Sequence, residues 1–210
     1  MSVPLYLTDP TKETELAKTL AIADASFLPR IVLKGPQAAE YLRSLGISIP
    51  ESILKVAPLK NGDLIARTGL SEFFLESGPV GWDSSPVLPT DGTGVPSYES
   101  IVGPGVYPVL RQDASLIISG SRAGELFRHV SSYDFLTDPH HDLVFTPIAG
   151  VSCSVLRTEL NHIPVFRLWT DGTYGLYIWH TLLEVATELG GGAAGTAVFF
   201  PGLSQREANR

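Results

Sequence analysis

Two stretches of the sequence decide the fold: IVLKGPQAAEYLR at residues 31–43 and LIISGSRAGELFR at residues 116–128. They align without a gap at a constant offset of 85 residues, from 31 to 116, and a glycine, an alanine, a glutamate and an arginine recur in matching places. Each stretch has a β-rich apolar run, a tight glycine turn and then apolar residues at helical spacing. The repeat therefore predicts a fold built by internal duplication.

Further elements flank both copies of this pattern. We expect a helix at residues 13–25 and 179–189, and strands at residues 64–67, 72–76, 151–158, 164–169 and 174–178. Alternating or continuous β-rich runs bounded by turn residues are typical of strands, and a 3.6-residue apolar stripe is typical of a helix. The chain is thus predicted to be α+β, with duplicated strand-helix-strand-strand (ferredoxin-like) halves whose helices pack on a mostly antiparallel sheet.

The domain organisation follows from the same repeat. We expect one unit over residues 1–210, with repeat one at about 13–76 and repeat two at about 106–190. Between them lies a loop, 77–105, rich in Gly, Pro, Ser and Asp, and after them a tail, 191–210. A loop of this length is either functional or simply mobile, and both readings stay open. Each half alone would have a thin core, so separate folding is not expected.

Composition excludes several classes of function. The net charge of −7 makes nucleic acid a poor partner, because an acidic surface repels phosphates. The single cysteine cannot form an intramolecular disulfide, which fits a reducing compartment. No signal peptide and no run of about 20 apolar residues is recognised, so neither export nor a membrane-spanning helix is expected. We expect a cytoplasmic globular protein.

Three motifs with chemical potential favour structural readings. The glycines of residues 190–195 match the dinucleotide-binding pattern but follow a helix, whereas that motif must open one. Adjacent His140 and His141 would point to opposite faces of a strand and cannot easily share a metal ion. Cys153 lies in an apolar run and is expected in the core. No catalytic residue and no metal site are therefore predicted.

The repeat also carries a resemblance to a known family. LAIADAS at residues 20–26, followed by the strand, glycine turn and helix of repeat one, resembles the opening of the aminomethyltransferase (glycine-cleavage T-protein) folate-binding fold. The second half, with DASL at 113–116, DFLTDP at 134–139 and LYIW at 176–179, resembles the gamma subunit of heteromeric sarcosine oxidase. The resemblance covers nearly the whole chain except residues 77–105 and the tail.

That resemblance implies a non-catalytic, gamma-type subunit of a sarcosine-oxidase-like flavoenzyme. Such a complex oxidatively demethylates N-methyl amino acids and feeds one-carbon metabolism. The flavins, the nicotinamide dinucleotide and the folate site belong to the larger subunits, and the gamma subunit packs against the alpha subunit. We therefore expect no cofactor bound by this chain and a larger alpha-like partner. A homo-oligomer of the isolated chain stays open.

Two residues are candidates for a vestigial cofactor pocket. Active aminomethyltransferases have Gly-Tyr-Glu-Ile late in the domain, and the glutamate holds the folate pterin; here the similar stretch is GLYI, with Tyr177 in the glutamate's place. A phenol cannot replace an ionised bidentate acceptor. Asp24 matches an early family aspartate and either pins the first helix to the sheet or lines the pocket. The alternative function is a standalone folate-binding C1 transferase or sensor that binds tetrahydrofolate.

Aromatic residues gather near the end of the chain, at Trp169, Tyr174, Tyr177 and Trp179. Aromatic side chains at the end of a sheet are most often part of the core. The same residue types also anchor protein interfaces. Both roles stay open for this group on the sequence alone.

Overall fold

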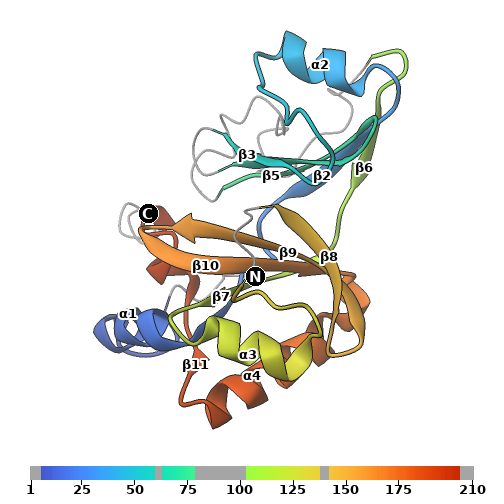
Figure 1. Ribbon diagram of the computed structural model, residues 1–210. Coiled ribbons are helices and arrows are strands. Elements are labelled where there is room, and N and C mark those ends of the chain that lie inside the picture. Colours follow the sequence, from blue (N-terminus) through green and yellow to red (C-terminus); the bar gives the residue numbers. More distant parts are fainter. Residues whose placement is uncertain (1–5, 60–62, 79–102, 138–141, 204–210) are drawn as a thin grey trace. The chain divides into compact units, whose positions relative to one another are not determined.

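The computed structural model describes residues 6–59, 63–78, 103–137 and 142–203, which form two compact units (Figure 1). Leu28–Gln112 form a unit that we call the inserted unit. Met1–Phe27 and Asp113–Arg210 together form the discontinuous unit. The sequence predicts a single unit over residues 1–210, and this stays a prediction.

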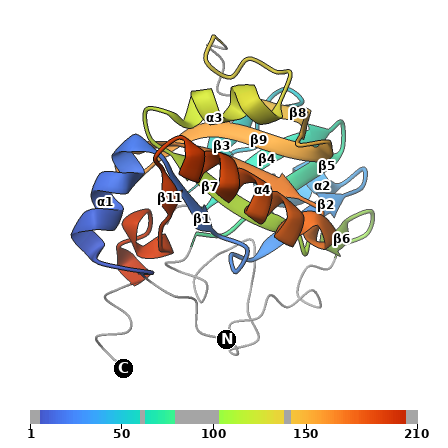
Figure 2. The ribbon, with the colours of Figure 1, turned by 90° about the horizontal axis from the view of Figure 1, so that it is seen from below.

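The discontinuous unit is a mostly antiparallel sheet with helices against it. Its strands, in spatial order, are β11 (Gly192–Ala193), β1 (Ala21–Asp24), β7 (Ala114–Ser119), β10 (Ile163–Thr170), β9 (Val151–Leu160) and β8 (Leu143–Ile148). Among these described strands, the pairing of β11 with β1 is parallel and the others are antiparallel. The helices are α1 (Pro10–Thr19), α3 (Ala123–Val130) and α4 (Gly175–Glu188), with short 3-10 turns η4 (Gly172–Tyr174) and η5 (Thr196–Val198). Figure 2 shows α3 and α4 on the same face of this sheet.

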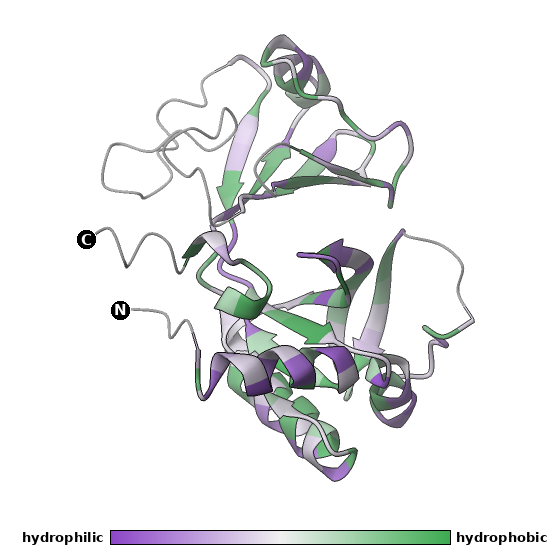
Figure 3. Cartoon of the chain, turned by 90° about the vertical axis from the view of Figure 1, so that its left-hand side faces the viewer, coloured by the Kyte–Doolittle hydropathy of each residue, from purple (hydrophilic) through white to green (hydrophobic). Residues whose placement is uncertain are grey.

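The core of this unit lies between the sheet and those two helices. Helix α4 faces the sheet with Ile178, Leu182 and Ala186, which are fully buried and spaced four residues apart. This is the apolar stripe that a surface helix needs in order to pack. Phe127 of α3 contacts Phe166 of β10 edge to face, with ring centroids 5.0 Å apart. Helix α1 is more polar, and its turns are largely purple and white in Figure 3.

The inserted unit is a smaller antiparallel sheet with one helix. Its strands, in spatial order, are β3 (Val56–Pro58), β4 (Leu64–Gly69), β5 (Glu72–Glu76), β2 (Arg30–Lys34) and β6 (Tyr107–Leu110). Helix α2 (Ala38–Ser44) packs through Ala38 and Leu42 on the face that holds Leu33 and Phe73. On the paired positions of β2 and β5, Arg30 and Glu76 form a buried ion pair at 3.3 Å.

The two sheets have the same topology, which confirms the predicted duplication and the α+β class. The order β3-β4-β5-β2-β6 in one unit corresponds to β8-β9-β10-β7-β1 in the other. The strand that precedes each repeat is exchanged: β1 leads into β2 but pairs with β7, whereas β6 leads into β7 but pairs with β2. The chain of the inserted unit thus leaves from β1 and returns to its antiparallel neighbour, β7.

The repeated glycine turn is required by this exchange. Gly35 and Gly120 have φ angles of 118° and 100°, which L side chains rarely adopt. A Cβ on Gly35 would lie 2.2 Å from the carbonyl oxygen of Gly105, just before β6. A Cβ on Gly120 would lie 2.4 Å from the carbonyl of Thr19, just before β1. Both turns are therefore close backbone contacts with the exchanged strands.

Two predicted elements are wrong in part. The helix predicted at residues 13–25 is α1 only to Thr19, and residues 21–24 form β1. This segment pairs on both sides, with β7 and β11, so tertiary pairing decides its conformation over local spacing. The strand predicted at residues 174–178 is the start of α4, which follows the turn capped by Asp171.

The structure also adds a strand to each half. Strands β3 and β8 follow the repeat helices, so each half is strand-helix-strand-strand-strand. Most of the predicted 77–105 loop, as well as His140 and His141, lies outside the described residues. The interpretation of those segments stays a prediction.

Both sheets have edge strands that contain a proline. Pro58, Pro108 and Pro147 lie in β3, β6 and β8, each at an edge. Proline has no N–H, so it fits a paired strand only where that position faces away from the partner. Each proline interrupts the free edge and disfavours the addition of a further strand.

Over the described residues, no helix has the length and apolar character needed to cross a membrane.

Candidate functional site

Asp24 ends strand β1 and is exposed. Its Oδ1 accepts a hydrogen bond from the backbone N–H of Ser26 at 2.8 Å. The hydroxyl of Ser26 in turn accepts from the N–H of Ser115 at 3.0 Å, on the neighbouring strand β7. Asp24, which was predicted either to pin the first helix or to line a pocket, thus stabilises the turn by which the chain leaves this sheet.

Tyr177 lies in the first turn of α4, where its side chain is half exposed. Its hydroxyl donates a hydrogen bond to the carbonyl oxygen of Ala149 at 3.0 Å. Ala149 and Gly150 have positive φ angles and form the two-residue turn between β8 and β9. Tyr177 thus connects the start of α4 to this hairpin.

The structure does not bring Asp24 and Tyr177 together. Strand β1 is separated from β9 by β7 and β10, which makes about 14 Å at about 4.8 Å per strand spacing. Tyr177 reaches the hairpin at the far side of β9. The two candidates therefore belong to opposite sides of one sheet end, and cofactor binding by either stays a prediction.

The late aromatic group divides between core and surface. Trp169 of β10 is buried, and Trp179 packs against the core of the discontinuous unit. Tyr174 and Tyr177 are each 51% exposed, and Leu176 between them is 71% exposed. The sequence reasoning missed Leu176 because it assigned this segment to a strand. The helical spacing of the buried Ile178, Leu182 and Ala186 is the signal that could have placed it on a helix surface.

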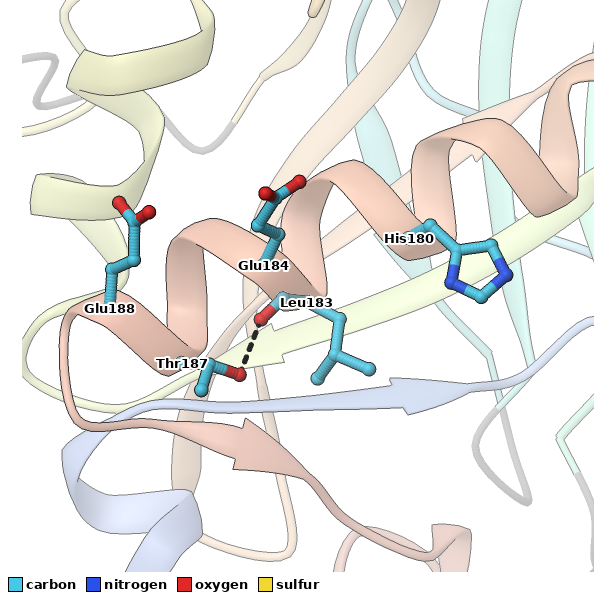
Figure 4. Close-up of a pocket in the computed structure, with 5 residues that line it drawn as sticks. All are labelled: His180, Leu183, Glu184, Thr187 and Glu188. Atoms are coloured by element: carbon cyan, nitrogen blue, oxygen red, sulfur yellow. Dashed lines mark hydrogen bonds between the residues drawn. The ribbon is translucent and has the colours of Figure 1, made fainter.

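The exposed side of α4 continues toward the end of the helix. His180, Leu183, Glu184, Thr187 and Glu188 line a shallow, open hollow of about 480 Å³ (Figure 4). In Figure 4 the carboxylates of Glu184 and Glu188 point to the same side of the helix. The described lining residues all come from α4, so the hollow is a feature of the helix surface.

A second hollow lies on the inserted unit and measures about 590 Å³. Its lining includes Pro36, Gln37, Glu40, Tyr41 and Ser44 around α2, together with residues 103–106. Burial raises the pKa of the Tyr41 hydroxyl, so this phenol is neutral at physiological pH. The hollow is open to solvent and offers mainly neutral hydrogen-bonding groups.

Cys153 is buried in β9, which confirms its predicted place in the core. Burial raises the pKa of its thiol, and Sγ donates to the carbonyl oxygen of Val151 at 3.3 Å. A buried neutral thiol is a poor nucleophile. Among the residues that the structure describes, no three His, Cys, Asp or Glu side chains gather to hold a metal ion.

Comparison with known proteins identifies the fold and leaves the family open. No family model and no curated protein matches the chain. A chain of the heterotetrameric sarcosine oxidase from Corynebacterium sp. U-96, in complex with pyrrole 2-carboxylate, superposes with a TM-score of 0.63 at 13% identity. The superposition covers 85% of this chain and 91% of that one.

The glycine cleavage system aminomethyltransferase T from Bartonella henselae superposes with a TM-score of 0.65 at 15% identity. It matches 93% of this chain, but this chain spans only 54% of that protein. The architecture is therefore of the aminomethyltransferase type, as the sequence resemblance implied.

Proposed function

We propose that this protein is a non-catalytic, gamma-type subunit of a heteromeric, sarcosine-oxidase-like flavoenzyme that oxidatively demethylates N-methyl amino acids. The observation that carries the proposal is the extent of the fold match. The superposition covers 91% of a chain from a heterotetrameric sarcosine oxidase, and 54% of the aminomethyltransferase T chain. The fold of nearly a whole chain of that oxidase is therefore shared with this chain, and this supports a comparable role in such a complex.

The chemistry of the described residues agrees with a subunit that does not catalyse by itself. At the place where the family resemblance puts the pterin-binding glutamate, Tyr177 uses its hydroxyl to bond a main-chain carbonyl. The lone thiol is buried and protonated. The two hollows formed by described residues are open to solvent. By the family resemblance, flavin and substrate would bind in larger partner subunits.

The test is purification of the tagged protein from its native cells under mild conditions. We expect an eluate with flavin absorbance near 450 nm, larger subunits, and production of peroxide or reduction of an electron acceptor when sarcosine is added. The separately expressed chain should show no such activity. If it oxidises sarcosine without a partner, or if the native eluate contains no flavoprotein, the proposal is wrong.

The alternative is a standalone folate-binding C1 transferase or sensor. It is favoured by the match of 93% of this chain to an aminomethyltransferase. Titration of the isolated chain with tetrahydrofolate distinguishes the two proposals. Binding at micromolar concentration, weakened by substitution of Asp24, would support the alternative, and no binding at millimolar folate would reject it.

A further inference from the structure

The outward side of α4 combines an apolar end with an acidic end. At the start of the helix, the exposed residues are Tyr174, Leu176 and Tyr177. Toward its end they are His180, Glu184 and Glu188, together with Thr187 and the partly exposed Leu183. We call this set the α4 face. Tyr177, His180, Glu184 and Glu188 recur at intervals of three or four residues, so they form one stripe.

We propose that the α4 face docks onto an arginine-bearing surface of a partner protein. Its apolar end would cover apolar atoms of the partner, and Glu184 and Glu188 would pair with guanidinium groups. The identity of that partner as a larger flavoenzyme subunit rests on the proposed function, but the chemistry of the surface does not.

The apolar end is the first argument. Leu176 is 71% exposed, and the tyrosines beside it are each 51% exposed. Clustered large apolar side chains on a protein surface mark interaction sites, and tyrosine is enriched among residues that dominate binding energy. Tyr177 is held in place by its hydrogen bond to Ala149, so its ring is presented at low entropic cost.

The charges are the second argument, and they determine which kind of partner fits. Helix α4 contains no lysine or arginine. Glu184 and Glu188 are four residues apart, near the end of the helix where the backbone dipole is negative. Like charges at this spacing and carboxylates at this end both disfavour the helix. Such local conflicts in a native sequence are typical of functional sites.

The cation Arg122 does not offset the carboxylates of Glu184 and Glu188. Arg122, at the N-cap of α3, donates to the carbonyl oxygen of Leu189 at the end of α4. Its guanidinium is also engaged by Glu125 through two hydrogen bonds, at 2.8 and 2.9 Å. The charge of Arg122 is therefore balanced by Glu125. Glu184 and Glu188 remain available to an external cation at the rim of the hollow that they line.

Arginine suits both ends of the α4 face. Its guanidinium binds carboxylates in a bidentate manner and also stacks on tyrosine rings. An anionic membrane surface or a nucleic acid would be repelled by the two glutamates and by the net charge of −7. A basic protein surface with exposed aliphatic groups is the occupant that satisfies both ends.

A synthetic amphipathic helix of leucine and arginine serves as the probe, titrated into the protein by calorimetry. We expect the double variant Glu184→Lys/Glu188→Lys to raise the Kd at least tenfold. The matched control Glu40→Lys/Glu51→Lys changes the net charge equally at exposed positions of the inserted unit, and should change the Kd less than threefold. Equal weakening by both variants, or no binding to the unmodified protein, would overturn the inference.

The native complex provides the second arm. Leu176→Glu should abolish recovery of the flavin-containing subunits, whereas Leu70→Glu, at a surface leucine of the inserted unit, should not. If both variants recover the complex equally, the α4 face is not the docking surface but the proposed function stands. If the unmodified protein recovers no flavoprotein, the proposed function fails, and the peptide titration alone decides the docking chemistry.

Discussion

The carboxylate of Glu13 should be one of the most important side chains for the stability of the discontinuous unit. Glu13 is in α1 and only 1% exposed. It accepts hydrogen bonds from the backbone N–H groups of Leu7 and Thr8 before the helix, and from the N–H of Gly195, 2.7 Å away, near the other end of the chain. One carboxylate thus ties the start of the chain to the segment that follows β11.

The substitution Glu13→Ala should cost about 2–4 kcal/mol of unfolding free energy. The N–H of Gly195 is buried and would lose its acceptor, at about 1–3 kcal/mol. The partly buried N–H groups of Leu7 and Thr8 can recover water and would add about 1 kcal/mol in total. With an m-value of about 2 kcal/mol/M, the urea midpoint should fall by about 1–2 M.

The control is Glu15→Ala in the same helix. Glu15 pairs with Lys18 at 2.6 Å, but both side chains are about two-thirds exposed, at 66% and 60%. Such a surface pair is worth about 0.5 kcal/mol or less. If urea unfolding followed by circular dichroism shows Glu13→Ala within about 0.5 kcal/mol of Glu15→Ala, the argument from buried donors is refuted.

Three further outcomes are expected. Gly35→Ala and Gly120→Ala should each lower the free energy of unfolding by about 3 kcal/mol or more, because a positive φ and overlap with the neighbouring backbone coincide at both positions. Gly46→Ala, where φ is 75° and the space around it is open, should cost only about 1 kcal/mol. Equal losses at all three positions in thermal unfolding would contradict this. Cys153 should resist a thiol reagent until urea unfolds the protein, and rapid labelling of the native protein at pH 8 would be the contrary result. Because burial raises the thiol pKa, its contribution to stability is fully present below the unfolded pKa of about 8.5 and is lost as the pH rises through the folded pKa. Tyr177→Phe should lower the urea midpoint only slightly, by about 1 kcal/mol or less, since the lost hydrogen bond is solvent-exposed; a loss above about 2 kcal/mol would assign it a larger role.

The repeat was predictable because its signals are local. Each copy contains its own apolar run, its glycine turn and its amphipathic helix within thirteen residues, from 31 to 43 and from 116 to 128. The strand β1 was not predictable in the same way. Its partner β7 is distant in sequence, with Ile22 paired to Ile118, and an apolar run buried on both faces has no period that separates strand from helix.

The candidate surface was missed for a similar reason. Aromatic and β-branched residues at 174–178 have strand propensity, but the segment continues directly into the helical stripe that Leu182 and Ala186 complete. The Asp171 side chain accepts from the N–H of Thr173 and caps the turn before the helix, which is a local helix-start signal. Exposure of Leu176 depends on which face of α4 the sheet covers, and that is settled only by packing.

The topology explains how the inserted unit can interrupt the discontinuous unit without separating its paired strands. The inserted unit leaves β1 and returns at β7, and these strands are antiparallel neighbours, with Asp24 opposite Leu116. Its two ends therefore meet, as the ends of a long hairpin loop do, and lengthening such a loop costs little closure entropy. The α4 face belongs wholly to the discontinuous unit, where Ile178, Leu182 and Ala186 anchor it on the sheet. Changes within the inserted unit should accordingly spare docking, whereas changes to α4 should not.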